Sequence, residues 1–437
     1  MNETKLQNLI TFLEGALSPF HAVAQQCARL DAAGYERLSE AQVWTLEAGK
    51  GYYLTRNGSA LIAFRLPKCS ARRFMITASH SDSPVLKLKD APEMPAVNGM
   101  KRLNTEVYGG ALLAPWFDRP LGVAGRLVTR TARGMETHLV DCGRDVALIP
   151  SLAIHFDRQA NNGHAIKPQA ELLPVYGLEG APDLLDLAAE AAGVARADIL
   201  AHDLVLYNAE QPRVWGAKGE FLSAGKLDDL ASVHASLEGF LAAGQSASIP
   251  VHAVFDNEEI GSSTMQGACA GFLRDTLSRI AAALGWTEQA YLTALAESFL
   301  LSSDGAHAAH PNHTECADPV TRARVGGGVA LKFSGAQRYA TDAVSAAVVR
   351  RAADLAGISV QTYVNHSDYP GGTTLGNLSV RQVAVRTADV GIPMLAMHSP
   401  YETCGVSDVE DLAALCRALY SAELTETVPG AYEIRMA

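Results

Sequence analysis

Histidine and carboxylate residues stand in small polar clusters along the chain and are the strongest candidates for chemistry. They are His80, Asp82, Asp228, Glu258, Glu259, Asp304 and His398. Imidazole and carboxylate groups together suit zinc or manganese. A centre with two ions needs a bridging carboxylate, further ligands on each ion and room for a water molecule. The set is large enough to supply all of these and one spare glutamate.

The spare glutamate belongs to an adjacent pair, Glu258 and Glu259. Adjacent residues of a strand point to opposite sides, but beyond a strand end the chain can turn and direct both side chains into one cavity. One carboxylate would then bind metal. The other would accept a proton from a water whose pKa the metal has lowered to about 7.

Each residue taken alone also has a structural explanation. Asp228 and Asp229 can cap the helix that begins near Leu230, and Asp304 before Gly305 is typical of a turn. The glutamate pair fits a solvated turn equally well, and each histidine can bond a backbone carbonyl. Because all the clusters would have to fall at similar places by coincidence, their joint occurrence favours a site.

Short apolar runs precede four of the clusters. These runs cover residues 74–77, 251–255, 299–301 and 394–397. Runs of this length followed by turn residues predict buried strands of a mostly parallel sheet. Helical stretches at 230–243 and 340–355 lie between them, so the alternation predicts an α/β fold with helices on both faces of the sheet. Ligands bind beyond the carboxyl ends of such strands, which is where the clusters fall.

The segment 87–222 has a different character. It contains strand-like pieces at 121–129, 137–140 and 203–207, a helical stretch at 183–192, and loops rich in Asn, Gly and Pro. We predict that it is a β-rich domain inserted into the α/β domain, which would comprise residues 1–86 and 223–437. A length of 437 residues exceeds what one hydrophobic core usually supports, in agreement with two domains.

The amino-acid composition limits which partners the protein can bind and in which cell compartment we expect it. The 36 Lys and Arg residues against 47 Asp and Glu residues give a net charge of −11, which argues against nucleic acid and anionic membranes. No apolar run is long enough to span a bilayer. The 7 cysteines are scattered without a C-x-x-C pair, so we expect a reducing, cytoplasmic location and no thiolate metal site.

Four ordered motifs carry a resemblance to a known family. The runs 77–84 (TASHSDSP), 255–262 (FDNEEIGS), 303–312 (SDGAHAAHPN) and 397–399 (MHS) resemble the motifs of the M18 metallopeptidases, which include the aspartyl aminopeptidases. The resemblance extends from residue 18 to about residue 402. It implies a zinc-peptidase α/β domain with a mostly parallel sheet, interrupted by a β-rich dimerisation domain, and a homo-oligomer in which dimers assemble into a dodecamer.

The resemblance also implies a ligand set for two zinc ions in each subunit, with manganese or cobalt as alternatives. Asp228 would bridge the two ions. His80 and Asp304 would complete the coordination of one ion, and Glu259 and His398 that of the other. Four of these residues lie within the four motifs, and Asp228 lies between the first and the second of them.

Further roles follow from the same resemblance. Glu258 would be the general base, and Asp82 would orient His80. His155 resembles a family histidine that reaches the active site of a neighbouring subunit, where it would polarise the scissile carbonyl. Lys332 resembles a lysine near the pocket for the substrate side chain. The structural alternatives are a histidine packed at a domain surface and a strand lysine that extends to solvent.

Three positions depart from the family pattern. Tyr401 stands where the family carries an arginine, Asp229 replaces an asparagine, and His366 replaces a residue that is commonly cationic. We predict that His366 and Tyr401, with Lys332, contact the substrate, and the departures leave a preference for acidic N-terminal residues open.

The resemblance and the residue set together predict a di-zinc aminopeptidase that hydrolyses N-terminal residues, Asp or Glu among them, from peptides. One alternative is a related di-zinc carboxypeptidase or amidohydrolase, because the spacing of ligands does not reveal exopeptidase polarity. The other is a non-catalytic assembly scaffold, which is disfavoured because the complete ligand set and the base are present.

Overall fold

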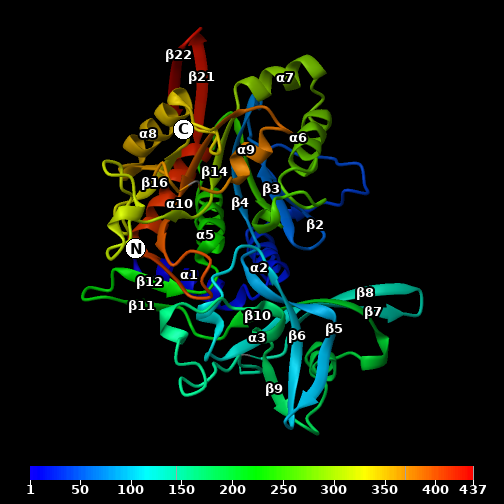
Figure 1. The fold of residues 1–437 in the computed structure, drawn as a ribbon. Coiled ribbons are helices and arrows are strands. Elements are labelled where there is room, and N and C mark those ends of the chain that lie inside the picture. The colour runs from blue at the N-terminus through cyan, green and yellow to red at the C-terminus, as the bar shows by residue number, and fades with distance from the viewer. Residues whose placement is uncertain (144, 370, 437) are drawn as a thin grey trace.

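A nine-stranded sheet forms the centre of the larger part of the molecule (Figure 1). The computed structural model describes residues 1–143, 145–369 and 371–436. In spatial order the sheet contains β1 (Glu36–Arg37), β2 (Gly51–Arg56), β3 (Ala60–Arg65), β13 (Ser248–Phe255), β4 (Arg73–His80), β14 (Phe299–Ser303), β18 (Arg386–Gly391), β16 (Val329–Phe333) and β17 (Val360–Val364).

The middle of this sheet is parallel. Strand β13 runs parallel to β4, β4 to β14, and β14 to β18. Antiparallel pairs occur toward the edges, where β3 meets β13 and β16 meets β18. Every residue of β4, β13 and β14 is buried, as expected for strands covered on both faces. The predicted α/β fold with a mostly parallel sheet is confirmed.

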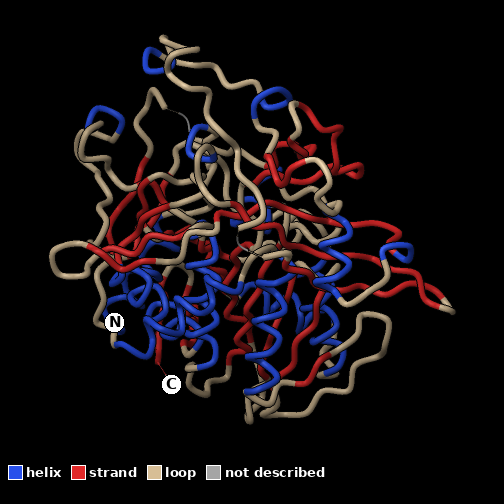
Figure 2. The backbone as a smooth tube through the Cα atoms, turned by 90° about the horizontal axis from the view of Figure 1, so that it is seen from below, coloured by secondary structure: helices blue, strands red, loops and turns tan. Residues whose placement is uncertain are grey.

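Helices cover both faces of the sheet. One face carries α1 (Glu3–Gly15), α2 (Pro19–Ala32), α5 (Leu227–Leu241), α8 (Ala343–Ala356) and α10 (Val406–Tyr420). The other carries α6 (Phe272–Ala283), α7 (Glu288–Ala296) and α9 (Leu375–Ser379). Figure 2 shows these helices and the strands packed together in one part of the molecule. None of the helices in the described ranges is both long and apolar enough to cross a membrane.

The two helices expected in the α/β domain are present with shifted ends. The stretch 230–243 corresponds to α5, but Asp228 and Asp229 at its start have non-helical backbone angles, so regular helical geometry begins only after Asp229, close to the expected start near Leu230. The stretch 340–355 corresponds to α8, which begins at Ala343 because the side chain of Asp342 accepts the backbone N–H of Ser345 and caps the helix.

A separate six-stranded antiparallel sheet occupies the lower part of Figure 1. Its order is β8 (Gly134–Asp141), β7 (Leu121–Thr131), β10 (Ile199–Asn208), β5 (Val85–Val97), β6 (Met100–Tyr108) and β9 (Val175–Leu178), with α3 (Pro168–Glu171) and α4 (Leu184–Ala192) nearby. The sheet and α4 share a hydrophobic cluster of their own. This arrangement supports the proposed inserted domain, whose limits at 87 and 222 stay a prediction.

A third sheet lies between these two parts of the chain. It contains β11 (Arg213–Trp215), β12 (Phe221–Ala224), β20 (Glu402–Gly405), β19 (Pro393–Leu395) and β15 (Ala306–His307), and a hairpin of β21 (Ala422–Val428) and β22 (Ala431–Met436) ends the chain. The run 394–397 was expected in the main sheet, and this expectation was wrong. The strand ends at Leu395, because Ala396 and His398 adopt positive φ angles that extended strands do not allow.

Candidate metal centre

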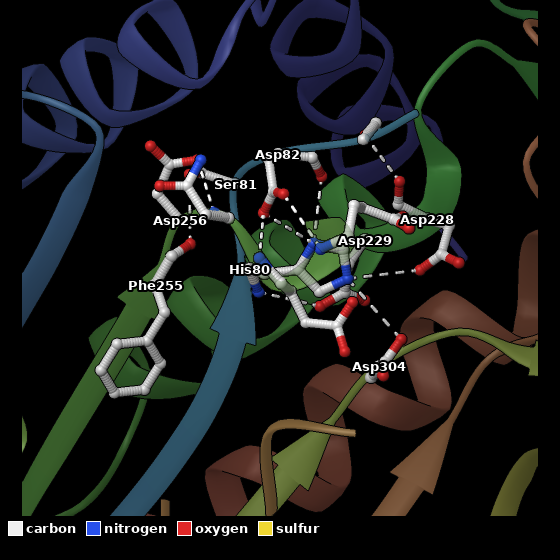
Figure 3. A network of polar contacts seen from close by, with 12 residues as sticks. His80, Ser81, Asp82, Asp228, Asp229, Phe255, Asp256 and Asp304 are labelled. Atoms are coloured by element: carbon white, nitrogen blue, oxygen red, sulfur yellow. Dashed lines mark hydrogen bonds and ion pairs between the residues drawn. The ribbon is translucent and has the colours of Figure 1, made fainter. Parts of the chain in front are cut away.

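The carboxyl ends of three neighbouring strands bring the predicted clusters to one place (Figure 3). His80 is the last residue of β4 and pairs with Phe255, the last residue of β13. Just beyond β13 the chain turns into a short 3-10 helix (Glu258–Ile260). Asp304 follows β14 directly, and Asp228 lies in the first turn of α5. Figure 3 shows the side chains of Asp228 and Asp304 pointing toward the ring of His80.

The two oxygens of Asp228 face two different imidazoles. Nε2 of His80 lies 3.6 Å from Oδ1 of Asp228 and 3.7 Å from Oδ1 of Asp304. Nε2 of His398 lies 3.7 Å from Oδ2 of Asp228 and 3.4 Å from Oε2 of Glu259. Two groups of atoms that could bind a metal ion therefore share one carboxylate.

The residues present fit zinc. Zinc binds nitrogen and oxygen at about 2.0–2.2 Å, so two such ligand atoms at the tetrahedral angle are about 3.4 Å apart. The four contacts around Asp228 lie close to this spacing and are longer than the roughly 2.7–3.2 Å of typical N–H···O hydrogen bonds. In addition, Oε1 of Glu259 is buried without a hydrogen-bond partner among the described residues. A buried carboxylate oxygen needs a donor or a cation.

The charges of the cluster also call for cations. Burial and the neighbouring charge of Asp304 raise the pKa of Glu258 to about 8. Burial and the charge of Asp228 raise the pKa of Glu259 well above its ordinary value. Burial has the same effect on Asp229, whose neighbours Asp304 and Asp228 are also acidic. Too much negative charge is gathered here for the carboxylates to ionise together, and divalent cations would compensate it.

Backbone carbonyls fix the orientation of both imidazoles. Nδ1 of His80 lies 3.0 Å from the carbonyl oxygen of Asp82, and Nδ1 of His398 lies 3.0 Å from that of Gly110. A carbonyl oxygen only accepts, so Nδ1 carries the proton in each ring. Nε2 is then left with a lone pair directed at Asp228, as a metal ligand requires.

Asp82 acts on two parts of the cluster. Its backbone oxygen is the nearer partner of His80, because its carboxylate oxygen Oδ1 lies 3.4 Å from Nδ1 of that ring. The carboxylate accepts the backbone N–H groups of Glu258 and Glu259, each at 3.1 Å. Asp82 therefore contacts both a predicted ligand and the turn that carries the predicted base.

Two supporting residues were missed as site residues in the sequence. Glu402 is buried, with 1% exposure, and accepts the backbone N–H groups of Asp228 and His398 at 2.9 Å and 2.7 Å. Asp229 accepts the backbone N–H of His80 through Oδ2 at 3.1 Å. The signals for Asp229 were its place beside Asp228 and its replacement of the asparagine of the family pattern. The family resemblance reaches Glu402 but assigned it no role, because its partners are backbone groups.

Comparisons with known proteins agree with this geometry. The family described as "Aminopeptidase I zinc metalloprotease (M18)" matches residues 12–420 of the chain. The chain belongs to the M18 family. It is similar to "Probable M18 family aminopeptidase 2" of Clostridium acetobutylicum, with 41% identity over 411 residues that cover 92% of this chain and 95% of the relative.

Solved structures of this family share the fold. A chain in the cryo-EM structure of the Ape4 and Nbr1 complex superposes with a TM-score of 0.92 and 31% identity, covering 96% of the M18 chain described here and 85% of the other. The structure of the mApe1 dodecamer of S. cerevisiae gives a TM-score of 0.84 and 27% identity, with 96% of each chain covered.

Family membership confirms the coarse prediction of function. This M18 protein is a metallo-aminopeptidase, a hydrolase of peptide bonds. The finding favours the aminopeptidase over the carboxypeptidase, amidohydrolase and scaffold alternatives. The individual residue roles stay predictions, which the contacts described above support to different degrees.

The predicted substrate residues of this M18 aminopeptidase lie in different settings. Lys332 is buried in β16, and its Nζ donates to the carbonyl oxygen of Gly305 at 2.5 Å and lies 4.0 Å from Oδ2 of Asp304. It therefore borders the metal cluster. Tyr401 is half-buried and donates its hydroxyl to the carbonyl oxygen of Gln211 at 3.0 Å.

The two remaining histidines are not joined to the cluster. His366 lines a cavity of about 250 Å³ together with His307 and Tyr363, and its Nδ1 accepts the backbone N–H of Asp368 at 3.2 Å. His155 is exposed in the loop between β8 and α3. Among the described residues, no hydrogen bond or ion pair links His155 to the predicted metal ligands.

Proposed function

We propose that this M18 aminopeptidase holds two zinc ions in each subunit and removes single residues from the N-termini of peptides. The observation that carries the proposal is the position of Asp228, whose two oxygens face His80 and His398 separately. Asp228 would bridge the ions. Asp304 would complete the group of His80, and Glu259 that of His398. Manganese or cobalt are alternative ions for the same ligands.

Glu258 is the proposed general base. Zinc held by these residues would supply Lewis acidity to the scissile carbonyl and to the attacking water. The backbone N–H of Glu258 donates to the carboxylate of Asp82, and this hydrogen bond holds the turn that carries Glu258. Its carboxylate would take a proton from the attacking water and return it to the nitrogen of the leaving amine. Burial raises its pKa to about 8 in the absence of cations, and nearby positive charge would lower this value.

The surroundings of the cluster support a role for Lys332 in substrate selection. Its ammonium group is fully buried, and its pKa is raised because neighbouring carboxylates, led by Asp304, outweigh the effect of burial. A cation near the pocket for the substrate side chain would favour acidic N-terminal residues. We propose that His366 and Tyr401, like Lys332, contact the substrate. Tyr401 lacks the charge of an arginine, which would weaken the preference.

The exposed loop around His155 supports a role in a neighbouring subunit. Leu152, Ile154 and Phe156 are 66%, 48% and 80% exposed, which is unusual for three such closely spaced apolar side chains. We propose that this loop docks on a second subunit, where His155 polarises the scissile carbonyl. The S. cerevisiae relative is described as a dodecamer, and we propose the same assembly, built from dimers, for this chain.

The test is metal-restored cleavage with metal analysis. The protein is treated with chelator, dialysed and assayed with Asp, Glu, Leu, Ala and Lys p-nitroanilides, with and without zinc, manganese or cobalt. Two zinc ions per chain and restored turnover are expected, with Asp and Glu substrates preferred. An N-acetylated peptide should resist cleavage, whereas its C-amidated counterpart should not. A folded protein that binds no stoichiometric metal would overturn the proposal.

A further inference from the structure

One tyrosine of the six-stranded sheet contacts the polar network behind the metal cluster. Tyr108 is the last residue of β6. Its hydroxyl donates to Oδ2 of Asp82 at 2.7 Å and accepts from Nδ2 of Asn257 at 2.8 Å. Tyr108 therefore joins a strand of the six-stranded sheet to two residues of the catalytic part of the chain.

Both hydrogen-bond partners of Tyr108, Asp82 and Asn257, belong to or contact the turn that carries Glu258 and Glu259. The two carboxylate oxygens of Asp82 accept the backbone N–H groups of Glu258 and Glu259. Asn257 begins this turn with a φ of 63°, a left-handed conformation that costs a non-glycine residue energy unless its surroundings hold it. Its side-chain oxygen accepts hydrogen bonds from Thr264 and Gln266.

The hydroxyl of Tyr108 links Asp82 to a second sheet, which the two backbone N–H contacts of Asp82 do not do. A carboxylate that accepts only two N–H groups of one short turn can move together with that turn. The third hydrogen bond comes from a different sheet, so it fixes Asp82 relative to the rest of the fold. Burial, together with the charges of Asp82 and Asp256, raises the pKa of Tyr108, so the hydroxyl stays a donor in the working pH range.

We infer that Tyr108 is a positioning residue, through which β6 fixes the turn carrying the general base Glu258 and the metal ligand Glu259. The inference rests on the proposed function for the roles of those two glutamates. Residues that orient metal ligands from outside the coordination sphere typically change metal affinity or activity about 10–100-fold when altered. A small misplacement of the base has an effect of similar size.

The surroundings of Tyr108 make a clean test possible. A cavity of about 150 Å³ adjoins Tyr108, Asp82 and Asn257, which is room enough for water. In Tyr108→Phe, water can satisfy the hydrogen-bonding groups that the hydroxyl leaves. It cannot tie Asp82 to β6. We therefore expect little loss of stability but a loss of positioning.

The experiment compares Tyr108→Phe with a matched control, Tyr53→Phe. Tyr53 also donates its hydroxyl to an aspartate, Oδ1 of Asp31 at 2.6 Å, but it lies outside the cluster. Tyr108→Phe should lower kcat roughly tenfold and weaken zinc binding roughly tenfold, measured by competition with a chromophoric chelator, with KM changed by less than about twofold. Tyr53→Phe should leave all three quantities at the wild-type values.

A double variant tests the route through Asp82. If Tyr108 acts through that carboxylate, Tyr108→Phe should slow Asp82→Asn by much less than it slows the wild type. Wild-type kcat and zinc affinity in Tyr108→Phe would overturn the inference, and so would a full tenfold further loss in the Asp82→Asn background. If the wild type binds zinc but cleaves no N-terminal residue, the proposed function fails, and the zinc affinity of Tyr108→Phe still decides the inference.

Discussion

The carboxylate of Glu402 accepts the backbone N–H of Asp228 at 2.9 Å, although the two residues are 174 positions apart in the chain. Its other oxygen accepts the backbone N–H of His398 at 2.7 Å. One buried side chain thus sets the spacing between the proposed bridging carboxylate and a proposed imidazole ligand. A glutamate suits this position because both of its oxygens accept.

Glu402→Gln should therefore weaken the metal centre without changing its ligands. The amide nitrogen of glutamine would face a backbone N–H, which costs about 1–3 kcal/mol for an unsatisfied buried group. We expect zinc affinity to fall about 10–100-fold, measured by chelator competition. Glu423→Gln is the matched control, because Glu423 also accepts a backbone N–H, from Ala247 at 2.8 Å. Equal zinc affinities for both variants would contradict the positioning role of Glu402.

Glu258→Gln tests the proposed base directly. Glutamine has nearly the same shape but cannot take up the proton of the attacking water, so kcat should fall about 10²–10⁴-fold. Zinc content should stay at the wild-type level, because Glu258 is not a proposed ligand. Near-normal turnover would refute its role as base. Loss of one zinc ion would instead make it a ligand, since its carboxylate lies within reach of His80 and Glu259.

The sequence predicted the residues whose positions follow from strand geometry. His80, Glu258 and Asp304 each stand three residues after a short apolar run, and the ends of parallel neighbours meet at one edge of a sheet. Because those three strands are adjacent, the pattern of apolar runs followed by polar residues was enough to predict that these side chains lie close together. The M18 resemblance then added the predicted pairing of ligands around Asp228, which spacing alone does not contain.

Other parts of the site depended on contacts that no local pattern encodes. The run before His398 is apolar, yet only three of its residues form a strand, in a different sheet. Glu402 binds backbone N–H groups, which every sequence possesses. Tyr108 meets Asp82 only because the six-stranded sheet is placed against the strand ends. Such residues become visible only when the tertiary arrangement is known.

Two buried histidines outside the metal cluster should make the protein sensitive to acid. Burial, together with the charge of Arg29, lowers the pKa of His252 and of His234 to about 3. Nε2 of His252 lies 3.0 Å from Oε1 of Gln26. In the unfolded chain each histidine titrates near pH 6.5, so between pH 6.5 and pH 3 the unfolded chain binds more protons. The stability present above pH 6.5 is lost as the pH falls.

At pH 5 this loss amounts to about 2 kcal/mol for each histidine. The measurement is the free energy of unfolding in urea at pH 7 and pH 5. His252→Gln should be less stable than the wild type at pH 7 but should lose about 2 kcal/mol less on acidification. Metal binding depends on pH in the same way in the wild type and in His252→Gln. Its contribution therefore cancels when the two losses of stability are compared. His313→Gln, at an exposed position, should lose as much as the wild type. The same loss in His252→Gln would contradict the argument.

The proposed action of His155 in a neighbouring subunit can be tested by mixing two inactive variants. Glu258→Gln lacks the base, and His155→Ala lacks the histidine of the exposed loop, so each should be inactive or nearly so as a pure oligomer. In a mixed dimer, the Glu258→Gln subunit supplies His155 to the intact base of the other. Random one-to-one dimers should then recover about a quarter of the wild-type sites.

The activity of co-expressed and reassembled mixtures decides between the two arrangements. A mixture of Glu258→Gln with His80→Ala is the control. Both changes lie in the metal cluster of their own subunit, so no mixed dimer regains a complete site. Recovery in the His155 mixture but not in the control requires that His155 act across the interface. If the His155 mixture is no more active than its separate components, the histidine acts within its own subunit or has no role in turnover.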